Sequence, residues 1–287
     1  MIEAKKQNIE KIQCLYFSPT GSTRKIILKV AENIGLKASA HIDLTPSEKR
    51  KSFTGKVEGD LLLVGTPVYA GTIPLPFLDS LHQLQGEGKW AVPVAVYGNR
   101  SPDTTIEEMT KILRGRGFKI LAAASFIAQH SFATPQHPWA LGRPDEKDMN
   151  AAAEFGQGIG RKFKSDPSEI SVSGQLMDKI SNTMVDVLPE GYHKVMSERP
   201  KGLWWVSVAN RDACTVCENC VKSCPTDAIN IEALSIDDGR CIRCMACVSA
   251  CPEGVLKLVY SDKPSALETY ANLDKIFVVR KEAKTFL

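Results

Sequence analysis

The chain has 287 residues, of which 43% are hydrophobic and 24% charged, as in ordinary globular proteins. Its 36 basic and 33 acidic side chains give a net charge of +3, which argues against a protein built to bind nucleic acid. We find no apolar run near the roughly 18 residues of a membrane-spanning helix and no signal peptide at the N-terminus. We therefore expect about two domains, at roughly 100–200 residues each, in a cytoplasmic protein.

Apolar runs alternate with helical patterns through the first half of the chain. Strands are expected at residues 12–17, 39–44, 60–65, 91–98 and 119–128. Helices are expected at residues 23–34, 76–84, 104–114 and 145–164. The third strand is apolar without alternation, as in a strand covered on both faces. This order predicts an α/β fold, a doubly wound five-stranded parallel sheet with helices on both faces.

The last of these helices has two features of its own. Asp145 is placed to cap its N-terminus. Gly156, Gly158 and Gly160 lie inside it, and we interpret them as sites of close helix packing. A dinucleotide-binding loop would need its glycines directly after a strand.

Ligands of a doubly wound sheet bind at the carboxyl ends of its strands. In the loop after the first strand, hydroxyl side chains surround a glycine at the start of a helix, where backbone N–H groups bind anions. The candidate phosphate-binding residues are Ser18, Thr20, Gly21, Ser22 and Thr23. The alternative is a capped turn without a ligand.

Two further loops follow the third and fourth strands. Their candidate residues are Thr66, Pro67, Val68, Tyr69, Ala70, Gly71 and Thr72, then Gly98, Asn99 and Arg100. The three loops together resemble the FMN-binding loops of flavodoxin-like domains. The resemblance implies that residues 66–72 cover one flavin edge and that residues 98–100 face the pyrimidine end, where Arg100 would favour negative charge near N1. Relatives often carry an aromatic residue after the Asn-Arg pair, whereas Ser101-Pro102 follows here, so Tyr69 is expected to bear more of the stacking. The alternatives are a core-edge aromatic for Tyr69 and a solvated charge for Arg100.

Eight of the nine cysteines lie in two runs of identical spacing, C-x2-C-x2-C-x3-C-P. They are Cys214, Cys217, Cys220 and Cys224, then Cys241, Cys244, Cys247 and Cys251. The second run repeats the first 27 positions later (241 − 214), which indicates an internal duplication. Clustered thiols in a chain without a secretory signal bind metal more often than they form disulfides. Cys14 stands apart and is interpreted as a buried apolar residue.

The cysteine runs resemble the signature of bacterial ferredoxins. The resemblance implies two [4Fe-4S] clusters, each held by three cysteines of one run and the fourth cysteine of the other. Cluster I would take Cys214, Cys217, Cys220 and Cys251, and cluster II would take Cys241, Cys244, Cys247 and Cys224. The alternative is a pair of zinc sites, which usually join two separated C-x2-C hooks.

A histidine and a pair of tryptophans lie near these motifs. His130 follows the fifth strand and is interpreted as a hydrogen-bonded loop histidine, with the border of a flavin or substrate pocket as the alternative. Trp204 and Trp205 precede the first cysteine run and are expected to form a hydrophobic plug between two domains.

Taken together, the chain resembles the flavodoxin–ferredoxin fusion family. We expect a flavodoxin-like FMN domain (residues 1–165), a linker with a helix at 176–188 (166–205), an α+β ferredoxin-like two-cluster domain (206–260) and a tail (261–287). The implied function is electron transfer between FMN and two [4Fe-4S] clusters. The implied partner is a redox protein, a ferredoxin or an oxidoreductase, with a homodimer left open. The alternatives are an FMN-dependent reductase of a small molecule, fed by the clusters, and a redox-sensing regulator.

Overall fold

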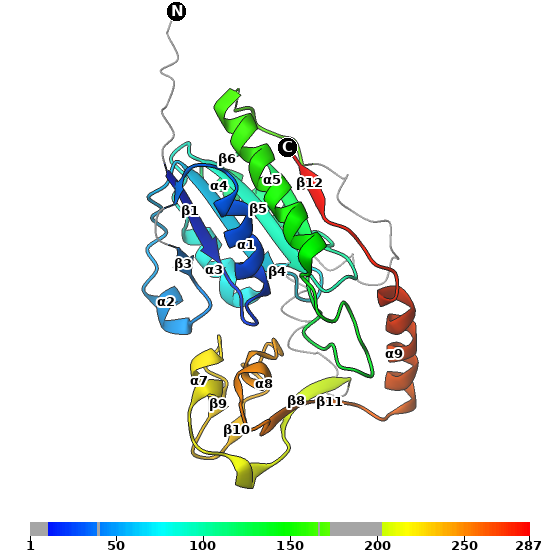
Figure 1. Cartoon of the computed structure of the whole chain (residues 1–287). Coiled ribbons are helices and arrows are strands. Elements are labelled where there is room, and N and C mark those ends of the chain that lie inside the picture. Colours follow the sequence, from blue (N-terminus) through cyan, green and yellow to red (C-terminus); the bar gives the residue numbers. More distant parts are fainter. Residues whose placement is uncertain (1–10, 39–40, 166, 173–202) are drawn as a thin grey trace, which may run out of the picture.

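The computed structural model describes residues 11–38, 41–165, 167–172 and 203–287 (Figure 1). The expected helix at 176–188 lies outside the described residues. In the described part of the chain, no helix combines the length and the apolar character needed to cross a bilayer.

The N-terminal part is built on one sheet with the strand order β12-β7-β5-β4-β1-β2. Its main strands are β1 (Lys11–Tyr16), β4 (Leu61–Pro67), β5 (Trp90–Tyr97) and β7 (Ala123–Ile127). Three short strands complete it, β2 (Lys37–Ala38), β3 (Ile42–Asp43) and β6 (Lys119–Ile120). All of these pair in parallel. With β2 and β3 sharing one edge position, the chain order across the sheet is 2-1-3-4-5, the flavodoxin-like order. The predicted fold class is confirmed.

One expected strand is divided. Residues 119–128 give β6 and β7, both paired with β5. Hydrophobicity predicts one apolar segment there, whereas its division depends on the pairing that each half makes with β5. Of the strand expected at 39–44, the structure describes β3, while β2 precedes the expected range, and both pair with β1.

Helices cover both faces of the sheet (Figure 1). Helices α1 (Ser22–Glu32) and α5 (Glu146–Ser165) pack on one face, and α3 (Leu75–Gln83) and α4 (Thr105–Gly115) pack on the other. Leu61 and Leu63 of β4 enter the first core, while Leu62 and Val64 enter the second. This explains why residues 61–64 are apolar without alternation.

The glycines of α5 sit where it touches its neighbours. A Cβ on Gly156 would lie 2.3 Å from the Val30 carbonyl oxygen, and one on Gly160 would lie 2.2 Å from the Ile34 carbonyl oxygen. Both contacts are with backbone of α1 or its end, so α5 approaches at a distance that only glycine permits. The interpretation as close helix packing is confirmed for Gly156 and Gly160, whereas Gly158 packs against the side chain of Leu287. Asp145 accepts a hydrogen bond from the N–H of Asp148 at 3.2 Å, as expected for a cap.

We expect Gly160→Ala to destabilise the protein by about 1–3 kcal/mol, because the added methyl group meets backbone that cannot rotate away. Gly115→Ala is the matched control, since Gly115 also lies in a helix but has no atom within 4 Å of an added Cβ. That change should be neutral or stabilise by up to about 1 kcal/mol. Urea unfolding of both variants checks this, and equal effects would contradict the packing argument.

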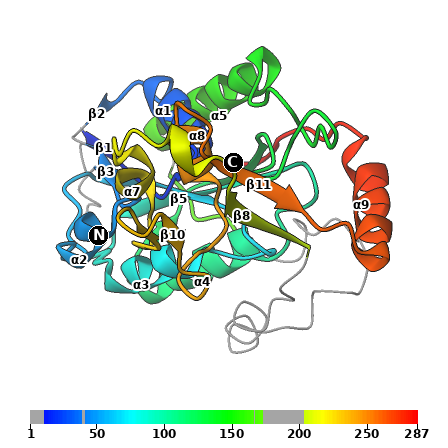
Figure 2. The ribbon, with the colours of Figure 1, turned by 90° about the horizontal axis from the view of Figure 1, so that it is seen from below.

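The cysteine-rich part lies at the carboxyl ends of the parallel strands, and seen from below it covers their loops (Figure 2). Strands β8 (Trp204–Val208) and β11 (Leu256–Tyr260) form an antiparallel pair, as do β9 (Ile229–Asn230) and β10 (Ser235–Ile236). A 3-10 turn spans Arg211–Ala213. Helices α7 (Asn219–Ser223) and α8 (Ala246–Ala250) begin 27 positions apart (246 − 219), so the sequence duplication is also a structural one.

The C-terminal residues return to the first sheet. Helix α9 (Pro264–Phe277) is followed by β12 (Lys284–Phe286), which pairs antiparallel with β7. Buried Asn99 donates to the carbonyl oxygens of Phe277 at 2.9 Å and Val279 at 2.8 Å, and accepts from the N–H of Lys281 at 3.0 Å. The tail is therefore part of the N-terminal fold.

Candidate functional site

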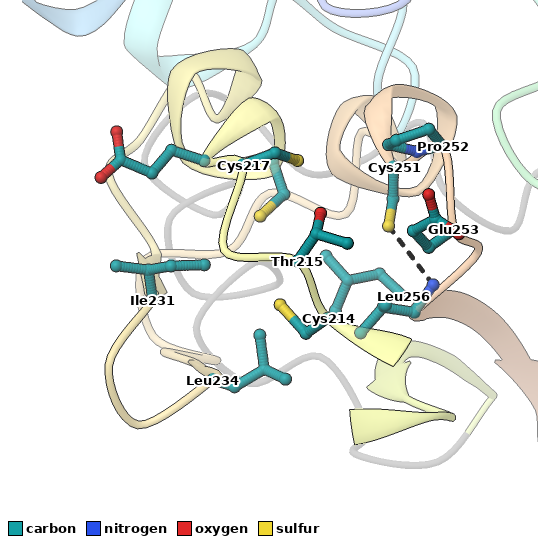
Figure 3. A pocket seen from close by; sticks show the side chains of 12 residues that line it. Cys214, Thr215, Cys217, Ile231, Leu234, Cys251, Pro252, Glu253 and Leu256 are labelled. Atoms are coloured by element: carbon teal, nitrogen blue, oxygen red, sulfur yellow. Dashed lines mark hydrogen bonds between the residues drawn. The ribbon is translucent and has the colours of Figure 1, made fainter. Parts of the chain in front are cut away.

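The first of two cysteine-lined cavities contains Cys214, Cys217, Cys220 and Cys251. Figure 3 shows the labelled cysteines with their sulfur atoms around this space. Its other lining residues are mostly apolar, among them Ile231, Leu234 and Leu256. The N–H of Val255 donates to the sulfur of Cys251 at 3.3 Å.

The second cavity contains Cys224, Cys241, Cys244 and Cys247. In the first repeat, the N–H of Ala228 donates to the sulfur of Cys224 at 3.3 Å. This bond corresponds to the one from Val255 to Cys251 in the second repeat. Each cavity therefore combines three cysteines of one run with the fourth of the other, the same two groups of four that the resemblance implies.

Backbone conformation brings the three cysteines of each run to one side. Val216 and Glu218 have φ angles of 53° and 59°, and their counterparts Arg243 and Met245 have 55° and 63°. Left-handed conformations are unfavourable for these residue types. Two of them in alternate positions curl the loop tightly, and the same pair recurs in both repeats.

Burial controls the thiol chemistry of the second cavity. It raises the pKa of Cys244 and of Cys247 to about 12, so both are neutral thiols until a cation displaces their protons. Among the described residues, no group of three or more His, Cys, Asp or Glu side chains is arranged to hold a single metal ion. Cys14 lies in β1, where burial raises its pKa to about 12, which fits the predicted apolar role.

The loop after β1 presents backbone donors. Gly21 precedes α1 with a φ of 85°, and no side chain caps this helix. Within the described residues, the N–H groups of Ser22 and Thr23 make no hydrogen bond to protein. Ser18 Oγ accepts from the N–H of Arg24 at 3.0 Å. The loop thus offers free N–H groups at the positive end of a helix, which suits an anion.

Not every residue of that loop faces outward. Thr23 is 2% exposed, and its methyl group packs beside Gly65 of β4. A Cβ added to Gly65 would lie 2.9 Å from that methyl carbon. The side chain of Thr23 therefore belongs to the core, and only its backbone N–H is available to a ligand. Thr20 is exposed.

The loop after β4 is a tight hairpin. Tyr69 and Thr72 pair across Ala70 and Gly71, whose φ angles are 52° and 85°. The hairpin is anchored to the start of α4, because Thr72 Oγ1 donates to Glu108. Tyr69 is half-buried and packs against the α3–α4 core, as does Ile242 of the cysteine-rich part. Earlier in the loop, buried Thr66 donates to the Pro67 carbonyl at 3.1 Å, and the N–H of Val68 donates to the Val96 carbonyl oxygen at 2.9 Å.

The loop after β5 differs from expectation in its side chains. The amide of Asn99 is occupied by the C-terminal tail, so only its backbone is available to a flavin. Arg100 forms an ion pair with Asp103, which reduces the charge expected near flavin N1. Gly98 packs against His130, leaving no room for a Cβ. The partners of the Asn99 side chain could not be predicted from the sequence, because they lie about 180 positions away in the chain.

His130 is partly exposed and lies in an aromatic cluster. Its ring packs within 5.3 Å, centroid to centroid, of Phe132, Trp139 and Phe277. Its Nδ1 accepts from the N–H of Phe132 at 3.1 Å. Burial, aided by the charge of Arg100, lowers the pKa of His130 to about 4. The predicted hydrogen-bonded loop histidine is confirmed.

This burial predicts a pH-dependent stability. In the unfolded protein His130 has a pKa near 6.5 and is protonated as the pH falls below that value. In the folded protein it stays neutral until about pH 4. Stability should therefore fall as the pH drops from 7.5 to 5.5, by about 1.5 kcal/mol from this group. His130→Gln should lose that part of the pH dependence, whereas His41→Gln, at an exposed site, should keep it. Urea unfolding at the two pH values measures the difference, and an unchanged slope in His130→Gln would refute it.

Contacts between the two parts were missed at the sequence level. Helix α2 (Ser47–Lys51) meets the turn after Cys224, where Ser47 Oγ donates to Asp227 at 2.8 Å. Arg50 donates to the carbonyl oxygens of Leu44 and Thr45, and also to that of Pro225. Helix α2 is a short polar segment that follows a proline, and nothing in its sequence indicates that it contacts another part of the chain.

Aromatic and apolar side chains complete this contact. Trp204 packs on Phe132 at 4.8 Å between ring centroids, which agrees with the predicted plug, while Trp205 is 37% exposed. Ile242, between two cysteines of the second run, packs against the α3–α4 core. The second cavity therefore lies beside the N-terminal domain.

Comparison with known families assigns the cysteine-rich part. Residues 207–256 match the family model described as a 4Fe-4S dicluster domain. The C-terminal part is a 4Fe-4S dicluster domain. Together with the strand order of the first sheet, this gives the chain the domain order of the flavodoxin–ferredoxin fusions. No curated protein matches the chain.

Solved structures similar to the chain align with about half of it. A flavodoxin from the domain Archaea has 18% identity and a TM-score of 0.39, covering 54% of this chain and 99% of its own. The flavodoxin of Streptococcus pneumonia TIGR4 has 17% identity and a TM-score of 0.39, covering 53% and 99%. A rubredoxin oxygen:oxidoreductase from the anaerobe Desulfovibrio gigas has 17% identity and a TM-score of 0.41, covering 54% and 36%.

Proposed function

We propose that the protein transfers electrons between FMN, bound to the flavodoxin-like domain, and two [4Fe-4S] clusters in the dicluster domain. The observation that carries the proposal is the pair of cavities, each lined by four cysteines, on a domain placed at the carboxyl ends of a flavodoxin-like sheet. Flavin accepts or donates two electrons, and each cluster exchanges one. The function would thus link one-electron traffic to a two-electron carrier.

For FMN, the supporting residues are those of the three loops. The N–H groups of Ser22 and Thr23 would bind the phosphate, aided by the hydroxyls of Thr20 and Ser22. The hairpin at Tyr69–Thr72 would border the ring system, with Tyr69 as its aromatic side. Gly98 and the backbone of Asn99 would meet the pyrimidine end. These residues bind and orient the group, and no acid or base among them is required.

For the clusters, the proposed ligands are the two cysteine groups that line the cavities. Apolar neighbours such as Val206, Ile229 and Ile236 exclude water from the second cavity. The N–H groups of Ala228 and Val255 donate to ligand sulfur atoms, which stabilises the more negative, reduced state.

The contacts at Arg50, Ser47 and Ile242 support transfer within the chain. They hold the second cavity beside the flavodoxin-like domain, so that no diffusional encounter is needed. We place the protein in the cytoplasm, whose reducing conditions suit free cysteines, with a redox protein as its external partner. We retain the proposed domain boundaries, except that residues 284–286 complete the first sheet.

The test is anaerobic purification of the full chain, followed by iron, sulfide and flavin analysis. About eight irons, eight sulfides and one FMN per chain are expected, since each cubane holds four irons. Zinc without flavin would refute the proposal. Reduced flavin should equilibrate with the clusters at a rate independent of protein concentration.

Gly21→Val tests the phosphate loop separately. Valine is strained at a φ of 85°, although no atom blocks its Cβ. We expect flavin affinity to fall at least about tenfold, equivalent to 1.4 kcal/mol, with iron content unchanged. Fluorescence titration of FMN into the apoflavin protein measures the affinity, and full retention of FMN would show that this loop is not its phosphate site.

The reductase alternative expects a substrate near His130 or Tyr69. His130 does not support it, because its ring is packed among Phe132, Trp139 and Phe277.

A further inference from the structure

The two repeats of the dicluster domain have the same loop backbone but different surroundings. We define the first-repeat loop as residues 215–219 and the second-repeat loop as residues 242–246, each starting one position after a cysteine. Both contain the same pair of left-handed residues and lead into equivalent helices. Any difference in their exposure therefore comes from what each loop faces.

The second-repeat loop faces inward. Ile242 packs against the α3–α4 core of the flavodoxin-like domain. Met245 is 3% exposed and belongs to a cluster on which Phe132 of that domain packs. Ala246 is 2% exposed.

The first-repeat loop faces solvent. All five of its residues are exposed, including the Cys217 thiol, and Val216 is 62% exposed. Thr215, Glu218 and Asn219 stand where the second repeat has Ile242, Met245 and Ala246. The two repeats thus share the geometry of a cluster-binding loop, but the first has polar residues at these three positions, while Val216 stands where the second has Arg243.

The surface beside this loop is acidic. Glu218 and Glu253 line the first cavity, and no basic side chain lines it. Lys222 lies 3.5 Å from Glu218, but both are largely exposed, so this pair is weak. A bound cluster with four thiolate ligands would add negative charge. Val216 supplies an apolar contact within this acidic rim.

We propose that the first-repeat loop, together with Glu253, is the docking surface for an external one-electron redox protein whose own surface carries lysine or arginine side chains. This inference rests on the proposed function. In each encounter one electron passes between the partner and the protein, one being oxidised as the other is reduced, without bond formation or proton transfer. The second-repeat loop, covered by the flavodoxin-like domain, is closed to such a partner.

The experiment uses the fully loaded, reduced protein and a lysine-rich cytochrome c as the probe. In Glu218→Gln/Glu253→Gln, the second-order rate of cytochrome reduction at low salt should fall about five- to tenfold and depend less on ionic strength. The matched control is Glu146→Gln/Glu154→Gln, which removes the same charge from exposed positions on α5. It should stay within about twofold of the parent protein.

Cross-linking supplies a readout independent of electron transfer. A carbodiimide should join cytochrome lysines to Glu218 or Glu253 in the parent protein, as mapped by mass spectrometry. Equal rates for the two double variants, or cross-links confined to the flavodoxin-like domain, would overturn the inference. Absence of flavin or iron would instead refute the proposed function, so the two failures are distinguishable.

Discussion

Cys220→Ser is expected to remove one cluster and with it about half of the iron, leaving about four atoms per chain. Cys220 is buried in the first cavity, and its side chain also belongs to the apolar core of the dicluster domain. Serine binds iron far less well than a thiolate, and ligation is coupled to folding at such sites. The small domain should therefore become more sensitive to protease, while the flavodoxin-like domain keeps its FMN.

The matched control is Cys14→Ala, which removes the ninth cysteine. Cys14 is as buried as Cys220 but lies in β1, among apolar neighbours of the first core. Its removal should leave iron content unchanged and cost only the few kcal/mol of a small cavity. Iron and sulfide assays on both variants decide the matter, and a Cys220→Ser protein with eight irons would refute the ligand assignment.

Arg143→Met is expected to lower the free energy of unfolding by about 2–3 kcal/mol, because it leaves buried Asp148 with only the partly exposed Arg280, 3.6 Å away, as a cationic partner. The two side chains are 6% and 2% exposed and form a two-pronged ion pair, with Arg143 Nε lying 2.8 Å from Asp148 Oδ2. Arg143 also donates to the carbonyl oxygen of Lys281 at 3.0 Å, so its loss should loosen the C-terminal tail. Hydrogen exchange at β12 should rise in parallel.

The comparison is with Lys147→Met, which breaks an ion pair to Glu282 whose side chains are 68% and 51% exposed. That pair also joins α5 to the tail, but solvent screens it, so the loss should stay within about 1 kcal/mol. Urea unfolding of the two variants gives the contrast. An Arg143→Met effect no larger than that of Lys147→Met would show that the buried pair does not hold the tail.

The alternation of apolar runs was enough to predict the fold, because each strand of a covered parallel sheet is itself apolar. Leu61–Val64 feeds both cores, and no other regular structure suits such a run between turns. The resemblance to bacterial ferredoxins, carried by the cysteine spacing, implied the same two groups of four that line the cavities. In both cases the signal is local and periodic.

Interactions between distant segments could not be predicted in this way. Asn99 was expected to meet a flavin, yet its side chain binds backbone of the tail. The contacts of Ser47 and Arg50 with the turn after Cys224 depend on how the domains meet. Aligning the two repeats places polar Thr215 opposite apolar Ile242. This difference would have indicated that the second repeat faces the flavodoxin-like domain.

The return of the chain to β7 changes what kind of assembly this is. The dicluster domain lies in sequence between α5 and β12, two elements of the same α/β unit, so it is an insertion and not an appendage. An appended module swings freely about a single tether, whereas an inserted one is restrained at both of its ends. Electron tunnelling depends steeply on separation, and a doubly anchored module keeps that separation narrow without a dedicated clamp. The same topology means that cutting the protein after the last cysteine would open the edge of the first sheet as well as shorten the chain.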